Sequence, residues 1–239
     1  VVFAVSQLED DELFNAGSGS QIQSDGKIIS GAGCEQLYGA STQKALARIL
    51  SNGNLDTTFN SGGVGLDSAT NGTRVEDIVL QPDGKILVAG EFESYNGTSR
   101  LDLLRLNTDG TLDTSFSHTL PVSTIQKSIS DIELLADGKM YVTVTNSATT
   151  TPALYRLNTD GSTDTSFVSK NFAKITSTSQ GVNVYSAKQA SDGKVVVSGN
   201  FEKYDNQFAR GLVRVLPNGD IDNTFVTSSG IGSTTVGFS

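Results

Sequence analysis

The sequence predicts an all-β protein, and within that class a β-propeller built from four-stranded repeats of about 51–58 residues. Short apolar runs alternate with turns rich in Gly, Ser, Thr, Asn and Asp, which is typical of many short strands. Helical periodicity is scarce along the whole chain. Phenylalanines recur 57, 51 and 58 residues apart, at Phe59, Phe116, Phe167 and Phe225.

The repeats share four landmarks at matching offsets. Each has an Asp-Gly-Lys turn, an arginine inside an apolar run, a glycine five residues later, and an aspartate three residues after that glycine. The turns begin at Asp25, Asp83, Asp137 and Asp192; the arginines are Arg48, Arg105, Arg156 and Arg214; the glycines are Gly53, Gly110, Gly161 and Gly219; the aspartates are Asp56, Asp113, Asp164 and Asp222. A fixed period of this length is typical of stacked supersecondary units.

We expect one domain over residues 1–239, because no linker or change of composition divides the chain. The repeats run at about 3–59, 60–116, 117–167 and 168–225, and residues 226–239 resemble the lead-in to a further repeat. Four repeats are compatible with a closed four-bladed ring and with an arc of a larger propeller. We expect the chain to be part of a larger polypeptide or assembly.

The second repeat shows why each segment should be a strand or a turn. Residues 75–81 alternate between apolar and polar side chains, as a half-buried strand does. Residues 85–92 are apolar on both faces, as expected of a strand between two sheets. Residues 101–107 form a third strand, and the turn after it leads to a fourth that ends at Phe116.

The turn between the first two strands has its own signature. Pro82 fixes φ at the first corner and Gly84 supplies the left-handed residue, so Gly84 and its counterparts should have positive φ. The same frame predicts strands at 21–23, 27–31 and 45–50 in the first repeat, and a complete unit over 184–225.

Units that are apolar on both faces must bury those faces against sequential neighbours. Radial stacking as propeller blades does this and exposes only short edges. A linear β-solenoid is the competing arrangement, but its coils are about half as long as these repeats. The propeller is therefore the favoured interpretation.

Charge and hydropathy limit the partners. The chain has 17 basic and 26 acidic residues, a net charge of −9. Such a surface repels the phosphate backbone, so we expect no nucleic-acid partner. The sequence contains no run of about 18 apolar residues, so we expect no membrane insertion. A protein or a surface glycan is the expected partner.

The motif DGKILVAG…RLNTDGTLDTSF, within residues 83–116, resembles the delta-60 repeat, a β-propeller-like repeat of bacterial surface proteins and phage virion or tail proteins. The resemblance covers residues 20–225. It implies an extracellular, cell-surface or virion location, and it brings no catalytic residue and no cofactor. The function it implies is a non-enzymatic module for adhesion, host recognition or structural support.

Catalytic residues are sparse in the sequence. His118 is the single histidine and Cys34 the single cysteine, so no triad recurs and no cluster of imidazoles can form. The alternative function is a polysaccharide-acting hydrolase, or a lectin-like glycan binder, that uses carboxylates and tyrosines of the channel or the loops.

The aspartate-rich turns have two interpretations. In the first, Asn107, Asp109 and Asp113 bind calcium, since they match the later part of an oxygen-rich loop. In the favoured one, the arginine at the position of the first ligand replaces the metal and pairs with Asp113, and likewise in the other repeats. Each arginine lies two positions after a leucine, on an apolar face where an unpaired charge would be costly.

The loop after the second strand is the remaining candidate binding site. It carries aromatic, amide and carboxylate groups that could contact a glycan or a protein. The candidates are Tyr38, Tyr95, Asn96, Tyr204 and Asp205. The favoured alternative is that these tyrosines pack against the turn and that Phe92 and Phe201 close the core.

Overall fold

A computed structural model describes residues 19–31, 44–68, 72–120, 128–145, 153–175 and 182–225, and every regular element in these ranges is a strand. The described residues contain no helix that is long and apolar enough to cross a membrane. Cys34, Tyr38 and residues 226–239 lie outside the described ranges.

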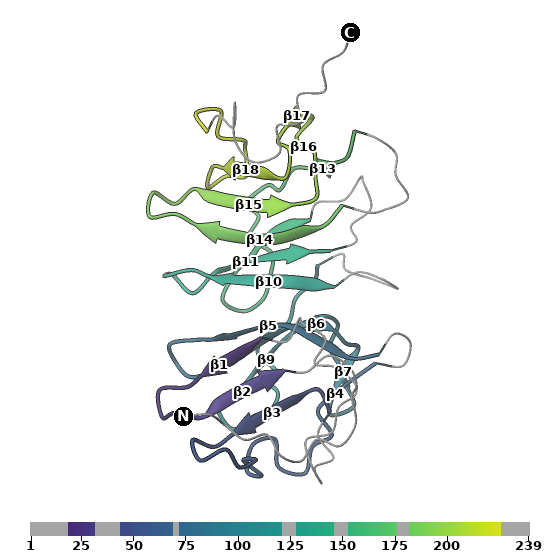
Figure 1. Ribbon diagram of the computed structural model, residues 1–239, viewed down its shortest axis with the longest axis vertical. Coiled ribbons are helices and arrows are strands. Elements are labelled where there is room, and N and C mark those ends of the chain that lie inside the picture. The colour runs from purple at the N-terminus through teal and green to yellow at the C-terminus, as the bar shows by residue number, and fades with distance from the viewer. Residues whose placement is uncertain are drawn as a thin grey trace.

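Each repeat contributes one main antiparallel sheet, and these four sheets are the blades of the propeller (Figure 1). The first blade contains β1 (Ser20–Ile22), β2 (Ile28–Gly31) and β3 (Leu46–Ile49); the second contains β5 (Arg74–Leu80), β6 (Ile86–Glu91) and β9 (Leu103–Leu106); the third contains β10 (Ile129–Leu134), β11 (Met140–Val144) and β12 (Leu154–Leu157); the fourth contains β14 (Val184–Gln189), β15 (Val195–Gly199) and β18 (Leu212–Val215).

Two small sheets lie beside the second and fourth blades. They contain β4 (Leu66–Asp67), β7 (Ser94–Tyr95) and β8 (Thr98–Ser99), and β13 (Phe172–Ala173), β16 (Lys203–Tyr204) and β17 (Gln207–Phe208). In the second and fourth repeats, the loop that follows the second strand is therefore a short hairpin. It pairs with the segment that leads into the same blade.

The four-stranded blade expected from the sequence is only partly formed. The fourth strand is reduced to one bridge in each repeat: Ile49 with Leu55, Leu106 with Leu112, Leu157 with Thr163, and Val215 with Ile221. The aspartate after the bridge ends the pairing, because its side chain bonds to the backbone two residues on, as Asp113 Oδ1 does with the Ser115 N–H at 3.0 Å.

The blades form an open arc. The first strands of the four main sheets, which we call the innermost strands, are β1, β5, β10 and β14. They pack in chain order: β1, together with β2, contacts β5, β5 contacts β10, and β10 contacts β14. The first and fourth blades lie at opposite ends of the molecule (Figure 1). Of the two arrangements compatible with four repeats, the described residues form an arc and not a closed four-bladed ring.

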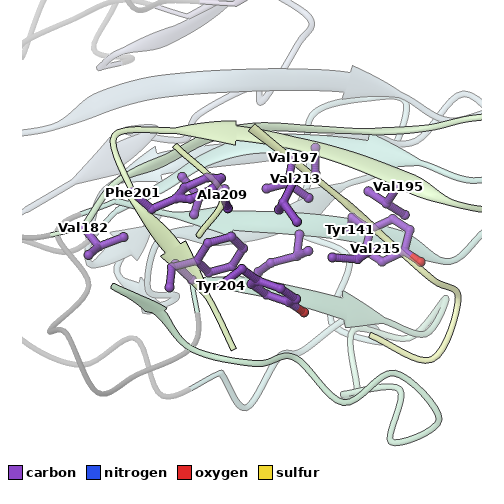
Figure 2. Packing of buried hydrophobic residues seen from close by; sticks show 14 of the residues in the cluster. Tyr141, Val182, Val195, Val197, Phe201, Tyr204, Ala209, Val213 and Val215 are labelled. Carbon is purple, nitrogen blue, oxygen red and sulfur yellow. The ribbon is translucent and has the colours of Figure 1, made fainter. Parts of the chain in front are cut away.

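The core lies between neighbouring blades. Leu87, Ala89 and Leu103 of the second blade pack with Met140 and Val142 of the third. Figure 2 shows the next junction, where Tyr141 of the third blade packs with Val195 and Val197 of the fourth. Both faces of a middle blade are buried, which explains why residues 86–90 are apolar without alternation.

The predicted glycine conformation is present in all four Asp-Gly-Lys turns. Gly26, Gly84, Gly138 and Gly193 have φ of 80–83°. The repeating phenylalanines are also largely buried: Phe59, Phe116 and Phe167 are at most 5% exposed, and Phe225 is half-buried.

Candidate functional site

The most regular polar site of the chain is the arginine–aspartate pair of each repeat. The arginine Nε donates to the aspartate Oδ2 at 2.7–2.8 Å, in the pairs Arg48–Asp56, Arg105–Asp113, Arg156–Asp164 and Arg214–Asp222. The partners are eight positions apart, and the residues between them form the end of a strand, a tight turn and the bridge. This path returns the carboxylate to the arginine, because the N–H of Asp113 donates to the carbonyl of Arg105 at 2.9 Å.

Lysines of the Asp-Gly-Lys turns join three of these pairs. Lys85, Lys139 and Lys194 place Nζ 2.8–3.1 Å from the carboxylate of their own repeat. In the first repeat, Lys27 pairs with Asp25 instead. Sequence reasoning missed the role of these lysines, although their recurrence in every Asp-Gly-Lys turn was a usable signal.

Each arginine also lies over the phenylalanine that ends its repeat. The guanidinium carbon is 4.7–5.3 Å from the ring centroid, in the pairs Arg48–Phe59, Arg105–Phe116, Arg156–Phe167 and Arg214–Phe225. A cation at this distance from an aromatic face is attracted to the ring. The phenylalanine therefore covers the ion pair on one side while packing in the core.

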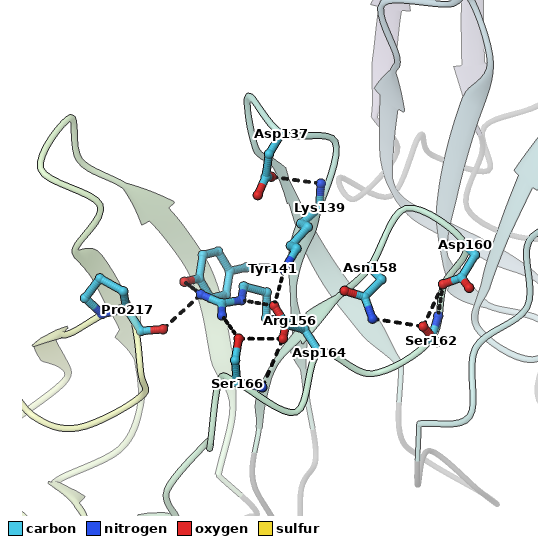
Figure 3. Close-up of polar contacts among 10 residues, drawn as sticks. All are labelled: Asp137, Lys139, Tyr141, Arg156, Asn158, Asp160, Ser162, Asp164, Ser166 and Pro217. Atoms are coloured by element: carbon cyan, nitrogen blue, oxygen red, sulfur yellow. Dashed lines mark hydrogen bonds and ion pairs between the residues drawn. The ribbon is translucent and has the colours of Figure 1, made fainter.

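The first three arginines also reach the following blade. The Nη1 atom of Arg48 donates to the Thr108 carbonyl at 2.7 Å, and that of Arg105 to the Thr159 carbonyl at 2.6 Å. Figure 3 shows the third case, in which Arg156 donates to the Pro217 carbonyl at 2.9 Å while Ser166 and Tyr141 bind the same guanidinium. Each of these three arginines thus joins its own turn to the next blade.

These contacts determine the electrostatics of the site. Burial opposes ionisation of Asp113, but hydrogen bonds from Lys85, Ser115 and Arg105 outweigh it and hold the pKa well below its usual range. The pKa of Asp164 is lowered in the same way by Lys139, Ser166 and Arg156. These carboxylates are therefore ionised at neutral pH.

The three residues that the calcium interpretation requires already make hydrogen bonds to other groups of the protein. Asp113 accepts from Arg105 and Lys85. Asp109 Oδ1 accepts from the Thr111 hydroxyl at 2.7 Å, and Asn107 donates to that hydroxyl at 2.9 Å. In the described ranges, no three His, Cys, Asp or Glu residues are grouped so that they could hold a metal. A cation at Asp113 would meet two positive side chains, which favours the ion-pair interpretation.

Of the candidate binding residues, the two described tyrosines are not available to a ligand. Tyr95 and Tyr204 are 1% and 0% exposed. Their hydroxyls donate to the carbonyls of Gly110 and Gly219, at 2.6 and 2.5 Å. Phe172 packs against Tyr204 with ring centroids 4.7 Å apart, and Figure 2 shows Tyr204 beneath Phe201 and Ala209. The hypothesis that these tyrosines bind a ligand is therefore wrong.

Asn96 has a structural role as well. Its Oδ1 accepts from the Gly65 N–H at 2.8 Å and the Val64 N–H at 2.9 Å, and its amide donates to Asn60 at 2.6 Å. This side chain ties the hairpin to the segment before β4. Asp205, at the corresponding place, is exposed with φ of 50°. Tyr38 lies outside the described residues.

His118 is held as a neutral imidazole. One ring nitrogen, Nε2, lies 2.6 Å from the Leu101 carbonyl, and Nδ1 lies 3.3 Å from the Leu120 N–H. An Nε2–H donor with an Nδ1 acceptor satisfies both contacts. Burial lowers the pKa of this imidazole, opposed by the hydrogen bond to Leu101. His118 is thus a partly exposed loop residue whose ring is bound on both sides.

One carboxyl has an unusually high pKa. Burial, together with the nearby carboxylates of Glu91 and Glu93, raises the pKa of Asp102 to about 7. Asp102 also has φ of 58°, at a place where the fourth repeat has Gly211 with φ of 83°. The sequence signal was an acidic residue at a position that is Ala45, Ala153 or glycine in the other repeats.

Besides the arginines, carboxylates on the first strand of a blade also bind the next blade. Asp77 accepts from the Ile132 N–H of the third blade at 2.8 Å, and Asp131 accepts from the Ala187 N–H of the fourth at 3.0 Å. A bulge precedes each of these aspartates in its strand. Carboxylates of one blade thus accept hydrogen bonds from backbone N–H groups at the edge strand of the next blade.

A family model described as "Domain of unknown function (DUF5122) beta-propeller" matches residues 23–59, 81–116, 135–167 and 190–225. The matched ranges end on the four repeating phenylalanines. No curated protein sequence matches the chain.

Among solved structures, the chain is similar to a streptogramin B lyase, with 13% identity and a TM-score of 0.54, over 88% of this chain and 55% of that one. It is also similar to a protein of unknown function from Bacteroides caccae (11% identity, 86% and 66% covered, TM-score 0.43) and to virginiamycin B lyase from Staphylococcus aureus (14%, 86% and 69%, 0.39). The chain spans about half of the first of these, and likeness at such identity shows the fold alone.

Proposed function

Because the chain belongs to the DUF5122 β-propeller family, we propose that it is a non-enzymatic scaffold or adhesion module of a bacterial cell-surface or phage virion or tail protein. The delta-60 resemblance of its repeats supports this class of parent protein. An extracellular or virion location and a protein or surface-glycan partner belong to the same proposal.

One observation carries the proposal: the polar and aromatic residues that recur in the repeats are bound within the fold. The arginine of each repeat holds its own aspartate, and three of the four also hold the following blade. Tyr95 and Tyr204 bind backbone carbonyls. Side chains that recur for packing and ion pairing suit a rigid support, on which variable exposed groups would contact a partner.

The experiment is a screen of the purified chain against surface polysaccharides, scored for both binding and hydrolysis. The proposal expects no turnover, with or without glycan binding. Turnover that a single carboxylate substitution abolishes would overturn it.

A second candidate function rests on the acidic group around Asp102. A carboxyl with a pKa of about 7, beside Glu91 and Glu93, has the protonation state that a general acid needs. If the chain is a polysaccharide hydrolase, Asp102→Asn and Glu93→Gln should each abolish turnover. Glu202→Gln is the matched control, because Glu202 occupies the place of Glu93 in a repeat where Gly211 replaces Asp102.

A further inference from the structure

The imidazole of His118 ties the chain that leaves the second repeat to the segment just before β9. Its Nε2 lies 2.6 Å from the Leu101 carbonyl, and the Leu120 N–H donates to its Nδ1 at 3.3 Å. Leu120 is 7% exposed and packs in the core cluster that the second and third blades share. One ring therefore connects the entry of β9 to a core residue between two blades.

The carbonyl that His118 reaches belongs to a strained turn. The Leu103 N–H donates to the same Leu101 carbonyl at 2.6 Å, around Asp102 with φ of 58°. A γ-turn with positive φ is the rare, strained form of this turn. Strained residues persist only where their surroundings hold them. The hydrogen bond from His118 is one of the contacts that hold this turn.

The first repeat has the same turn but a different tie. The Leu46 N–H donates to the Lys44 carbonyl at 2.8 Å, around Ala45 with φ of 59°. The second donor to this carbonyl is the backbone N–H of Leu66, at 3.3 Å, next to a bridge between Lys44 and Gly65. A backbone amide keeps its proton between pH 5 and 8, whereas an imidazole changes its charge in this range. The second repeat thus has a titratable group where the first has a backbone bond.

The two contacts of His118 require the neutral ring. Nε2 carries a hydrogen and donates, and Nδ1 is bare and accepts. An imidazolium carries a hydrogen on both nitrogens, so its Nδ1–H would face the Leu120 N–H, and two donors would meet. Proton uptake by the ring is therefore incompatible with the contact to Leu120.

The surrounding charges give the imidazolium little support. Residues 117–120 contain no other titratable side chain. The chain before β9 carries Arg100 and Asp102, and Glu91 and Glu93 lie at and just after the end of β6. Burial and the charge of Arg100 lower the pKa of His118. Burial raises the pKa of Asp102 to about 7, so that carboxyl is largely neutral where the ring would gain its proton. In the described part of the chain, no carboxylate pairs with the ring.

We propose that His118 is a pH-sensitive clasp: when its ring gains a proton, residues 117–120 detach from the segment before β9, and the core between the second and third blades loosens at Leu120. The pKa of the ring is lower in the clasped state than its ordinary value of 6.5. The clasped state therefore binds fewer protons than the open state. The clasp is at full strength above pH 6.5 and weakens as the pH falls below it.

Amide hydrogen exchange of the 239-residue chain, followed by NMR at pH 7.5 and pH 5, tests the clasp. Each rate is compared with the intrinsic rate at the same pH, which gives a protection factor. The factor of the Leu120 amide should fall by about fivefold or more, with about thirtyfold as the limit that one proton sets. The Leu66 amide is the matched control, and its factor should stay constant. The ring resonances of His118 should show the Nε2–H tautomer at pH 7.5 and titration below pH 6.5.

His118→Gln separates the proton from the rest of the side chain. Glutamine keeps a donor and an acceptor but does not titrate in this range, so the protection factor of Leu120 should be equal at the two pH values. Four results would overturn the proposal. They are a constant factor for Leu120 in the wild type, an equal fall at Leu66, the same pH dependence in His118→Gln, and a ring that titrates at or above pH 6.5.

Discussion

Arg105 and Thr159 lie 54 residues apart in the sequence, yet the guanidinium of the first donates to the carbonyl of the second at 2.6 Å. The same arginine binds Asp113 at 2.7 Å and lies over Phe116. One side chain therefore closes the turn of its own blade and holds the next blade in place.

Replacing Arg105 by Ala should destabilise the protein by about 3 kcal/mol, because the buried Asp113 carboxylate keeps only Lys85 as a cationic partner. Arg214→Ala should cost less, since its side chain is more exposed and holds no following blade among the described residues. Urea denaturation monitored by circular dichroism measures both. A chelator should leave the midpoint of the wild type unchanged; a fall in the midpoint would restore the calcium interpretation.

Gly110 and Gly53 form a matched pair for testing close approach of neighbouring blades. Both have strongly positive φ, 85° and 89°, so an alanine is strained at either position by about 1 kcal/mol. At Gly110 the added Cβ would also lie 2.7 Å from the Asn60 nitrogen. Gly110→Ala should therefore cost about 1–3 kcal/mol more than Gly53→Ala. Equal losses in thermal denaturation would count against the junction geometry.

Phe116→Ala should cost about 3–5 kcal/mol, because the ring is 1% exposed, packs in the core between two blades and covers Arg105. Phe225→Ala should cost clearly less, since that ring is half-buried. Chemical denaturation of the two variants gives the difference. A loss at Phe225 that equals or exceeds the loss at Phe116 would contradict this difference in burial.

Acid should weaken the protein through its paired aspartates. The folded-state pKa of Asp113 is held below the ordinary value of 3.8. The folded state therefore binds fewer protons than the unfolded state, and the stability from this pair is present above pH 3.8 and is lost as the pH falls below it. Asp113→Asn should be less stable than wild type at pH 7, with a difference that shrinks below pH 3.8. Unfolding free energies measured from pH 7 to pH 2.5 test this.

Asp102 should have the opposite pH dependence. Its pKa is raised from 3.8 to about 7, so the folded state binds the proton more tightly than the unfolded state. The destabilising contribution begins above pH 3.8 and is complete above pH 7. Asp102→Asn should raise the free energy of unfolding at pH 8 by about 4 kcal/mol and change it little near pH 3.5.

Thermal denaturation at both pH values measures this effect of Asp102→Asn. Asp205→Asn serves as the control, since Asp205 is exposed and also left-handed. A gain in stability for Asp102→Asn at pH 3.5 that equals the gain at pH 8 would contradict the titration.

The sequence was sufficient to predict the repeat, the turns and the ion pairs, because each depends on residue types that recur at fixed offsets. Arg105 on an apolar face needed a counter-charge, and Asp113 was the recurring one. The same logic could have found Lys85. It could not have found the Thr159 carbonyl, because every residue carries that acceptor and only the packing of two blades selects one.

The errors have local physical causes. The fourth strand was predicted from the turn at residues 107–110, but Asp113 bonds to the backbone of Ser115 and ends the pairing after one bridge. Tyr95 and Tyr204 were candidate ligand-binding residues because they lie in a polar loop. That loop folds back as a hairpin and carries the rings into the core, where each hydroxyl finds a backbone carbonyl. Pairing of a two-residue strand leaves no periodicity that a sequence could reveal.

The repeated bond from the arginine of one blade to a carbonyl of the next has a consequence for how the gene can change. Unequal recombination that removes or duplicates one whole repeat, from one phenylalanine to the next, joins an arginine to a turn of the kind it already recognises. In the product, each arginine still meets its own carboxylate and a carbonyl of the next blade, and the protein differs only in the number of repeats. An exchange that cuts between the arginine and the glycine five residues later must be in register in both parents, or the guanidinium and its carboxylate are separated.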